Sequence, residues 1–211
     1  MGPPATRPSE EQSPILVLGG TGTVGSRIAQ QLVARSIPVL VASRSGLGAR
    51  STAFRSSGDI SKDTENSSST EVKDNNGVVF DWNDRSTWEN PFVRSKTKAT
   101  TDSSIPDEAR NSIKSVYLIA PPSLDAASIM MDFVDFARAR GARRFVLQSA
   151  SAIESGGPVM GKVHAYLREL GTRGEVEWAV LRPTWFQREF CLSTCQYFLS
   201  AVFSLLLGPT Y

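Results

Sequence analysis

The segment ILVLGGTGTVGSRIAQQL, residues 15–32, decides the fold of this chain. Its first four residues, Ile15 to Leu18, are an apolar run typical of a buried strand, and a glycine-rich turn follows them. After the turn, Ile28, Ala29 and Leu32 lie on one face of an amphipathic helix. Strand, glycine turn and helix together form the context in which a glycine pattern binds a dinucleotide.

The glycines of this turn have separate tasks. Gly19 and Gly22 permit a tight turn that brings backbone N–H groups up to a pyrophosphate, and Gly25 lets the helix pack close to the strand. The N-terminus of the helix adds partial positive charge for the phosphates. The alternative is a glycine-rich turn with a structural role only. The residues expected to bind the cofactor here are Gly19, Gly20, Thr21, Gly22, Thr23, Val24 and Gly25.

The end of the second predicted strand, residues 38–42, indicates which cofactor is bound. A cofactor with a free ribose 2′-OH usually meets an Asp or Glu about 20 residues after the glycines. The chain has Ser43 and Arg44 there instead. A hydroxyl and a guanidinium suit a 2′-phosphate, because Arg can contact it bidentately. The sequence therefore favours NADP(H) over NAD(H). The alternative is that Arg44 simply ends a strand in solvent.

The composition bounds the class of protein. The chain has 211 residues, about one domain, and a net charge of +2 without the charged blocks that indicate nucleic-acid binding. Cys191 and Cys195 are too few for a disulfide framework and fit a reduced, cytoplasmic setting. The single histidine, His164, is far from them in sequence, so no metal site is predicted. Residues 1–14 lack the apolar core of a signal peptide and are predicted to be a disordered tail.

Strand and helix patterns alternate along the chain. This predicts an α/β fold, a doubly wound, mostly parallel sheet of the Rossmann-like class, over residues 15–190. Residues 45–76 are rich in Ser, Gly, Thr, Asp and Lys and are predicted to be a flexible insertion. The remaining strands are expected at residues 77–82, 116–122, 144–151 and 175–183, and the helices at 124–140 and 159–170.

In such a sheet the ligand lies beyond the carboxyl ends of the strands. Asp81 is expected there to accept a hydrogen bond from adenine, with Trp82 packed beside it; the alternative for Trp82 is a half-buried core aromatic. Ala120 and Pro121 are small and rigid and leave room for a ribose or nicotinamide, unless the pair merely stops a strand. Ser149, at the end of the next strand, completes the expected cofactor contacts.

Several strings of the chain, taken together, resemble the festuclavine and agroclavine dehydrogenases. They are FDWNDRSTWENPF (80–92), VYLIAPP (116–122), DFVDFARARGARRFVLQSAS (132–151), GGPVMGKVHAYL (156–167) and WAVLRPTWF (178–186). The family consists of fungal enzymes of ergot alkaloid biosynthesis among the NmrA-like atypical short-chain dehydrogenases. The resemblance implies a small-molecule alkaloid substrate and a reductase that passes hydride from NADPH to a C=N bond of a clavine iminium ion.

The resemblance stops after Phe186. Family members continue into a smaller substrate lobe, which has no counterpart here, so we expect a C-terminally divergent or truncated chain that binds NADPH but reduces poorly by itself. Residues 190–207 are nearly all apolar. Three alternatives stay open for this run, which belongs mostly to the divergent tail 191–211: a membrane anchor, an apolar helix covering an incomplete core, or an unstructured artefact of truncation. We expect residues 190–207 to reduce solubility, because they expose an apolar run with no evident partner.

The catalytic pair of ordinary short-chain dehydrogenases, Tyr-x-x-x-Lys, is absent, because Tyr166 is followed four residues later by Leu170. Tyr166 and His164 remain catalytic candidates, with core packing or solvent exposure as the alternative. A missing acid suits an iminium substrate, since hydride addition then yields a neutral amine and no alkoxide needs a proton. Trp185 and Phe186 are expected to form a substrate wall that tolerates a cation. The same absence fits an NmrA-like redox sensor that binds the dinucleotide without turnover.

Overall fold

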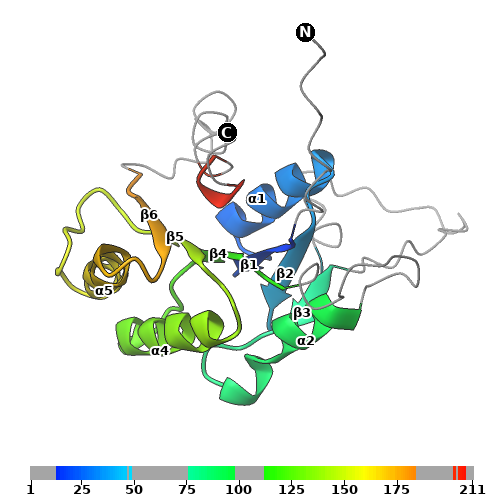
Figure 1. Ribbon diagram of the computed structural model, residues 1–211, viewed down its shortest axis with the longest axis horizontal. Coiled ribbons are helices and arrows are strands. Elements are labelled where there is room, and N and C mark those ends of the chain that lie inside the picture. Colours follow the sequence, from blue (N-terminus) through cyan, green and yellow to red (C-terminus); the bar gives the residue numbers. More distant parts are fainter. Residues whose placement is uncertain are drawn as a thin grey trace, which may run out of the picture.

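The computed structural model describes residues 13–46, 48, 76–97, 112–183, 202 and 204–207. In this part of the chain, six strands form one parallel sheet in the order β3-β2-β1-β4-β5-β6 (Figure 1). This is the strand order of the doubly wound dinucleotide-binding fold, so the predicted fold class is confirmed. The strands are β1 (Ile15–Leu18), β2 (Val39–Ser43), β3 (Gly77–Val79), β4 (Ser115–Leu118), β5 (Arg144–Gln148) and β6 (Glu177–Leu181).

Helices cover both faces of the sheet (Figure 1). On one face lies α1 (Thr23–Ala34), which buries the predicted stripe of Ile28, Ala29 and Leu32. On the other face lie α2 (Asn90–Thr97), α4 (Ala126–Ala139) and α5 (Met160–Thr172), with the short 3-10 helix η1 (Arg85–Thr87) before α2. The helices α1, α4 and α5 each bury an apolar stripe against the sheet. This burial is the main stabilising contribution to the two apolar clusters, one on each face of the sheet.

Four strands end earlier than the sequence pattern predicts. Residues 80–82, 119–122, 149–151 and 182–183 were expected to be strand but lie beyond the last strand residues. In β4 the reason is chemical, because Pro121 and Pro122 have no N–H to donate to a neighbouring strand. All four segments are therefore loops at the carboxyl edge, where such a fold binds its ligand.

An aromatic cluster fills the core under α4. The ring of Phe133 lies edge-on to Phe80 at 5.2 Å and to Trp82 and Trp88 at 5.4 Å each, measured between centroids. Such edge-to-face pairs add to the burial of apolar area. The cluster thereby joins α4 to the loop that follows β3.

The apolar C-terminal run contributes to the opposite core. Residues 202 and 204–207 are helical and lie beside α1 (Figure 1). Val202 and Leu206 are 0% and 1% exposed and pack in the α1-side cluster. The backbone oxygen of Leu206 accepts hydrogen bonds from Ser115 Oγ at 2.8 Å and Arg144 Nη1 at 3.2 Å. The expectation that the apolar run has no packing partner is therefore wrong for these two side chains. They lie on a short helical segment that covers this face of the sheet.

Other expectations fall on residues outside the described part. These are the tail 1–14 but for its last two residues, nearly all of the insertion 45–76, Cys191, Cys195, Trp185 and Phe186. Within the residues that are described, no helix combines the length and apolarity needed to cross a membrane.

Candidate functional site

The glycine turn after β1 is tightly closed by backbone hydrogen bonds. Gly19 has a φ of +64°, a left-handed conformation that a side chain would strain. Gly22 N–H donates to Gly19 O at 3.0 Å, and Gly20 N–H donates to Ala42 O at 3.3 Å. The turn is thus anchored to the end of β2 and leads directly into α1.

Gly25 allows α1 to begin directly on this turn. A Cβ atom at Gly25 would lie 2.4 Å from Gly19 O and 2.9 Å from Gly20 Cα, distances that real Cβ atoms do not reach. At Gly22, by contrast, a Cβ would meet only Gly19 O, at 3.3 Å. Gly25 therefore packs against the turn residues Gly19 and Gly20, and this places the N-terminus of α1 at the carboxyl edge of the sheet.

The N-terminus of α1 has free hydrogen-bonding capacity. Its N-cap residue, Gly22, has extended backbone, offers no capping side chain, and no acidic residue lies in the first turn. By α-helix geometry the N–H groups of Thr23, Val24 and Gly25 have no carbonyl acceptor within the helix. These donors and the positive end of the helix dipole suit an anion such as a pyrophosphate.

Ser43 and Arg44 lie where the sequence predicts a contact to the 2′-phosphate, at the carboxyl end of β2. Ser43 is buried, and its carbonyl accepts from Gly46 N–H at 3.1 Å and Phe80 N–H at 2.9 Å. The backbone of the turn is therefore fixed from two sides. The Arg44 side chain is exposed, and no acceptor for its guanidinium is found among the described residues.

The loop that carries Asp81 and Trp82 is held by hydrogen bonds between its own residues. Asp81 N–H donates to Thr87 Oγ1 at 2.8 Å, and Asp81 O accepts from Trp88 Nε1 at 3.1 Å. Asp81 Oδ1 accepts from Asn83 N–H at 2.9 Å, so one carboxylate oxygen is engaged inside its own turn. Trp82 is half-buried in the aromatic cluster, which corresponds to the core alternative for this side chain.

Two small residues follow β4, and a buried serine hydroxyl without a hydrogen-bond partner among the described residues follows β5. Ala120 is half-buried and Pro121 is buried. Ser149 is 4% exposed, and its buried Oγ has no hydrogen-bond partner in the described part of the chain. A buried hydroxyl without a partner is costly unless a ligand satisfies it. The structure therefore fits a polar ligand next to Ser149.

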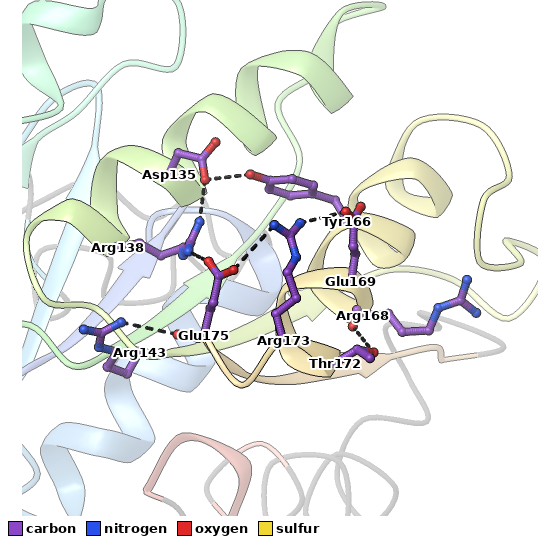
Figure 2. Close-up of polar contacts among 9 residues, drawn as sticks. All are labelled: Asp135, Arg138, Arg143, Tyr166, Arg168, Glu169, Thr172, Arg173 and Glu175. Atoms are coloured by element: carbon purple, nitrogen blue, oxygen red, sulfur yellow. Dashed lines mark hydrogen bonds and ion pairs between the residues drawn. The ribbon is translucent and has the colours of Figure 1, made fainter.

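Tyr166 is held in a way that opposes acid–base catalysis. Its hydroxyl donates to Asp135 Oδ1 at 2.6 Å (Figure 2). Burial, and then the hydrogen bond to Asp135, raise the pKa of Tyr166 to about 12. A tyrosine that exchanges protons near neutrality needs a lowered pKa instead. The geometry thus favours the structural alternative for Tyr166.

Figure 2 shows that Tyr166 belongs to a polar network joining α4, α5 and the turn before β6. Asp135 also binds Arg138 at 2.8 Å, and Arg138 pairs with Glu175. Arg173 bridges Glu169 at 2.7 Å and Glu175 at 3.5 Å. A groove of about 800 Å³ runs along this face, and none of its lining residues comes from the glycine turn. We therefore assign the face to structure rather than to cofactor binding.

His164 lies on the opposite side of α5. Its ring is tilted against that of Trp178, with 5.5 Å between centroids. Burial, followed by the positive charges of Arg168 and Arg182, lowers the pKa of His164. The imidazole is therefore neutral at pH 7 and packs as a partly apolar ring.

Replacing Tyr166→Phe is expected to leave cofactor affinity within about twofold of wild type, because the hydroxyl serves Asp135. The change should instead alter stability at high pH. The unfolded tyrosine ionises near 10.0 and the folded one at about 12, so its contribution is complete below pH 10 and lost as pH rises toward 12. Urea unfolding between these values should show a steeper decline for wild type than for the variant. Parallel curves would contradict this environment for Tyr166.

Comparison with known proteins identifies relatives. The chain is 41% identical over 172 residues to festuclavine synthase II of Penicillium roqueforti (strain FM164), a match of 82% of this chain and 47% of the relative. It is 35% identical over 176 residues to agroclavine dehydrogenase of Claviceps fusiformis, covering 83% of this chain and 48% of the relative. The chain is a relative of the festuclavine and agroclavine enzymes. The resemblance recognised in the sequence is thereby confirmed, and no protein-family model matches the chain.

The similarity to these relatives covers only part of their length. The chain spans about half the length of the curated relatives it matches. Among solved structures, a UDP-glucose 4-epimerase of Thermus thermophilus in complex with NAD gives a TM-score of 0.48 at 16% identity. That match covers 80% of this chain and 54% of the epimerase chain.

Proposed function

We propose that this chain carries the NADP(H)-binding unit of an oxidoreductase that reduces the C=N bond of a clavine-type iminium ion. The observation that carries the proposal is the start of α1, where Gly25 packs against Gly19 and leaves backbone donors free for a pyrophosphate. The relatives named festuclavine synthase and agroclavine dehydrogenase supply the substrate class. The cytoplasm is the setting we propose for it.

The carboxyl edge of the sheet has groups for each part of the cofactor. The N–H groups of Thr23 and Val24 would hold the pyrophosphate, and Ser43 with Arg44 the 2′-phosphate. The site for adenine is the ordered loop at Asp81, and that for nicotinamide is the region of Ala120, Pro121 and Ser149. NADPH supplies hydride when bound. Ser149 would satisfy its buried hydroxyl by a hydrogen bond to the nicotinamide or to the substrate.

The reaction needs orientation rather than a proton donor from this chain. Hydride transfer to an iminium cation neutralises it, so no developing alkoxide requires an acid. Holding the two reactants in a productive geometry and excluding water accounts for most of the acceleration in such a case. The engagement of Tyr166 with Asp135 agrees with a site that lacks a tyrosine acid. Trp185 and Phe186 remain our proposal for the wall beside the substrate cation.

Replacing Arg44→Ala is expected to weaken NADPH binding by about 1–3 kcal/mol, the size of a charge-assisted hydrogen bond to phosphate. NADH binding should change little, because NADH carries no 2′-phosphate. Fluorescence titration of both cofactors measures the two affinities. Arg35→Ala, at the far end of α1, is the control and should alter neither. Equal losses for NADPH and NADH would remove Arg44 from the 2′-phosphate site.

A second candidate function is that of an NmrA-like sensor which binds the dinucleotide without turnover. The observation favouring it is the locked Tyr166 together with the absent Tyr-x-x-x-Lys pair. An NADPH oxidation assay with a clavine iminium substrate separates the two, with the affinities for NADPH and NADP⁺ measured alongside. Turnover supports the reductase. Tight binding of NADP⁺ without turnover supports the sensor.

A further inference from the structure

The connection from β5 to α5, residues 149–159, is held against the end of β6. Ser149 N–H donates to Leu181 O at 2.8 Å, and Ser151 N–H donates to Pro183 O at 3.1 Å. The backbone pairing of β5 and β6 thus continues past both strands at the carboxyl edge. Arg182 lies between these two hydrogen bonds on the β6 side.

The side chain of Arg182 turns onto this connection and contacts it at three points. Its Nη2 donates to Ser151 O at 2.6 Å and to Glu154 Oε1 at 2.5 Å, while Nε lies 3.5 Å from Ala150 O. The planar, fork-like guanidinium can make such contacts in several directions at once. A single residue, directly after the end of β6, therefore holds the segment that follows Ser149 in place.

The backbone of Glu154 is held by the segment that leads into α5 (Met160–Thr172). Its carbonyl accepts from Gly157 N–H at 3.0 Å, and a Cβ at Gly161 would lie 2.4 Å from the same oxygen. Contacts therefore run from Arg182 to the side chain of Glu154, and from the Glu154 carbonyl to the closely packed Gly161 in α5. The string GGPVMGKVHAYL, which contributes to the family resemblance, begins two residues after Glu154.

The connection also contains a strained residue. Val159, directly before α5, has a φ of +45°, a conformation that β-branched residues rarely adopt. Strain of this kind persists only where surrounding contacts over-determine the backbone. Val159 O accepts from Lys162 N–H at 3.1 Å and from Val163 N–H at 3.4 Å, so the residue is held by the first turn of α5.

We propose that Arg182 is a positioning residue for the nicotinamide side of the site, an inference that rests on the proposed function. Its guanidinium fixes the backbone from Ala150 to Glu154. It thereby holds in one place the buried hydroxyl of Ser149, which has no hydrogen-bond partner among the described residues. Arg182 does this through the loop and not by touching the cofactor. The loss of Arg182 should therefore disturb the nicotinamide end while leaving the anchoring of the pyrophosphate intact.

The test compares Arg182→Ala with Arg144→Ala. Arg144 is a matched control, because it also pairs with a glutamate, Glu177, and a backbone carbonyl, but at the amino end of β5. In hydrogen exchange, the amides of Ser151 and Ile153 should open at least about tenfold faster in Arg182→Ala and at the wild-type rate in Arg144→Ala. The affinity for NADPH should stay within about twofold in both variants. The nicotinamide fluorescence of bound NADPH should change only in Arg182→Ala.

Turnover supplies a further readout that separates the two proposals. If the wild-type chain reduces the iminium, kcat of Arg182→Ala should fall at least about tenfold at an unchanged KM for NADPH. A wild-type chain without turnover counts against the proposed function alone, since exchange and fluorescence still test Arg182. The proposal is overturned if the amides of Ser151 and Ile153 exchange at the wild-type rate in Arg182→Ala. It is also overturned if they exchange faster while the fluorescence of bound NADPH is unchanged. If Arg182→Ala does not fold, Arg182→Lys takes its place, with the same criteria.

Discussion

Replacing Gly25→Ala is expected to lower both the stability of the chain and its affinity for NADPH. The added methyl group would lie 2.4 Å from Gly19 O, so the helix must move away from the turn. Forced overpacking of this kind costs about 1–3 kcal/mol of stability. The same movement misaligns the free N–H groups at the start of α1, and a loss of about 2 kcal/mol in binding corresponds to a roughly 30-fold weaker Kd.

The control for this substitution is Gly22→Ala, on the same turn. Its Cβ would meet Gly19 O at 3.3 Å, a contact that a shift of a few tenths of an ångström relieves. Thermal unfolding should therefore show a clearly smaller loss for Gly22→Ala than for Gly25→Ala. NADPH titration of both variants completes the comparison. Wild-type stability and affinity in Gly25→Ala would show that the helix start does not need glycine at this position.

Replacing Leu206→Asp should destabilise the chain by about 3 kcal/mol or more. Truncating a buried leucine alone costs about 2–5 kcal/mol. A carboxylate in its place would be buried in the apolar cluster that also contains Val17, Tyr117 and Val146, which adds a desolvation cost. The unfolding midpoint in urea should fall accordingly, and protein with an exposed sheet face should aggregate more readily.

Leu207→Asp is the matched control, one residue further along the same helix. Leu207 is 38% exposed, so a charge there stays in water and should change stability by less than about 0.5 kcal/mol. Equal effects of the two substitutions would mean that the face of the helix is irrelevant. Val202 and Leu206 would then not be part of the core in solution.

The sequence predicted the structure well where a single local pattern specifies both a secondary-structure element and a binding site. The apolar run Ile15–Leu18, the spacing of Gly19, Gly22 and Gly25, and the stripe on α1 are all encoded within 18 residues, and all are present. Alternation of strands and helices likewise predicted the parallel sheet. Strand ends were predicted less well, because apolar residues continue into the loops after β3 and β4 while the backbone pairing stops.

The sequence by itself determined the fold class, the glycine turn and the resemblance to the clavine enzymes. Each of these depends on residue types at short, fixed spacing. The tertiary structure alone decided the partners of individual side chains. Tyr166 meets Asp135 across 31 residues of sequence, Arg182 meets Ser151 across 31, and Ser115 meets the carbonyl of Leu206 across 91. No local pattern encodes such pairs, since they form only when the sheet brings distant segments to one edge or one face.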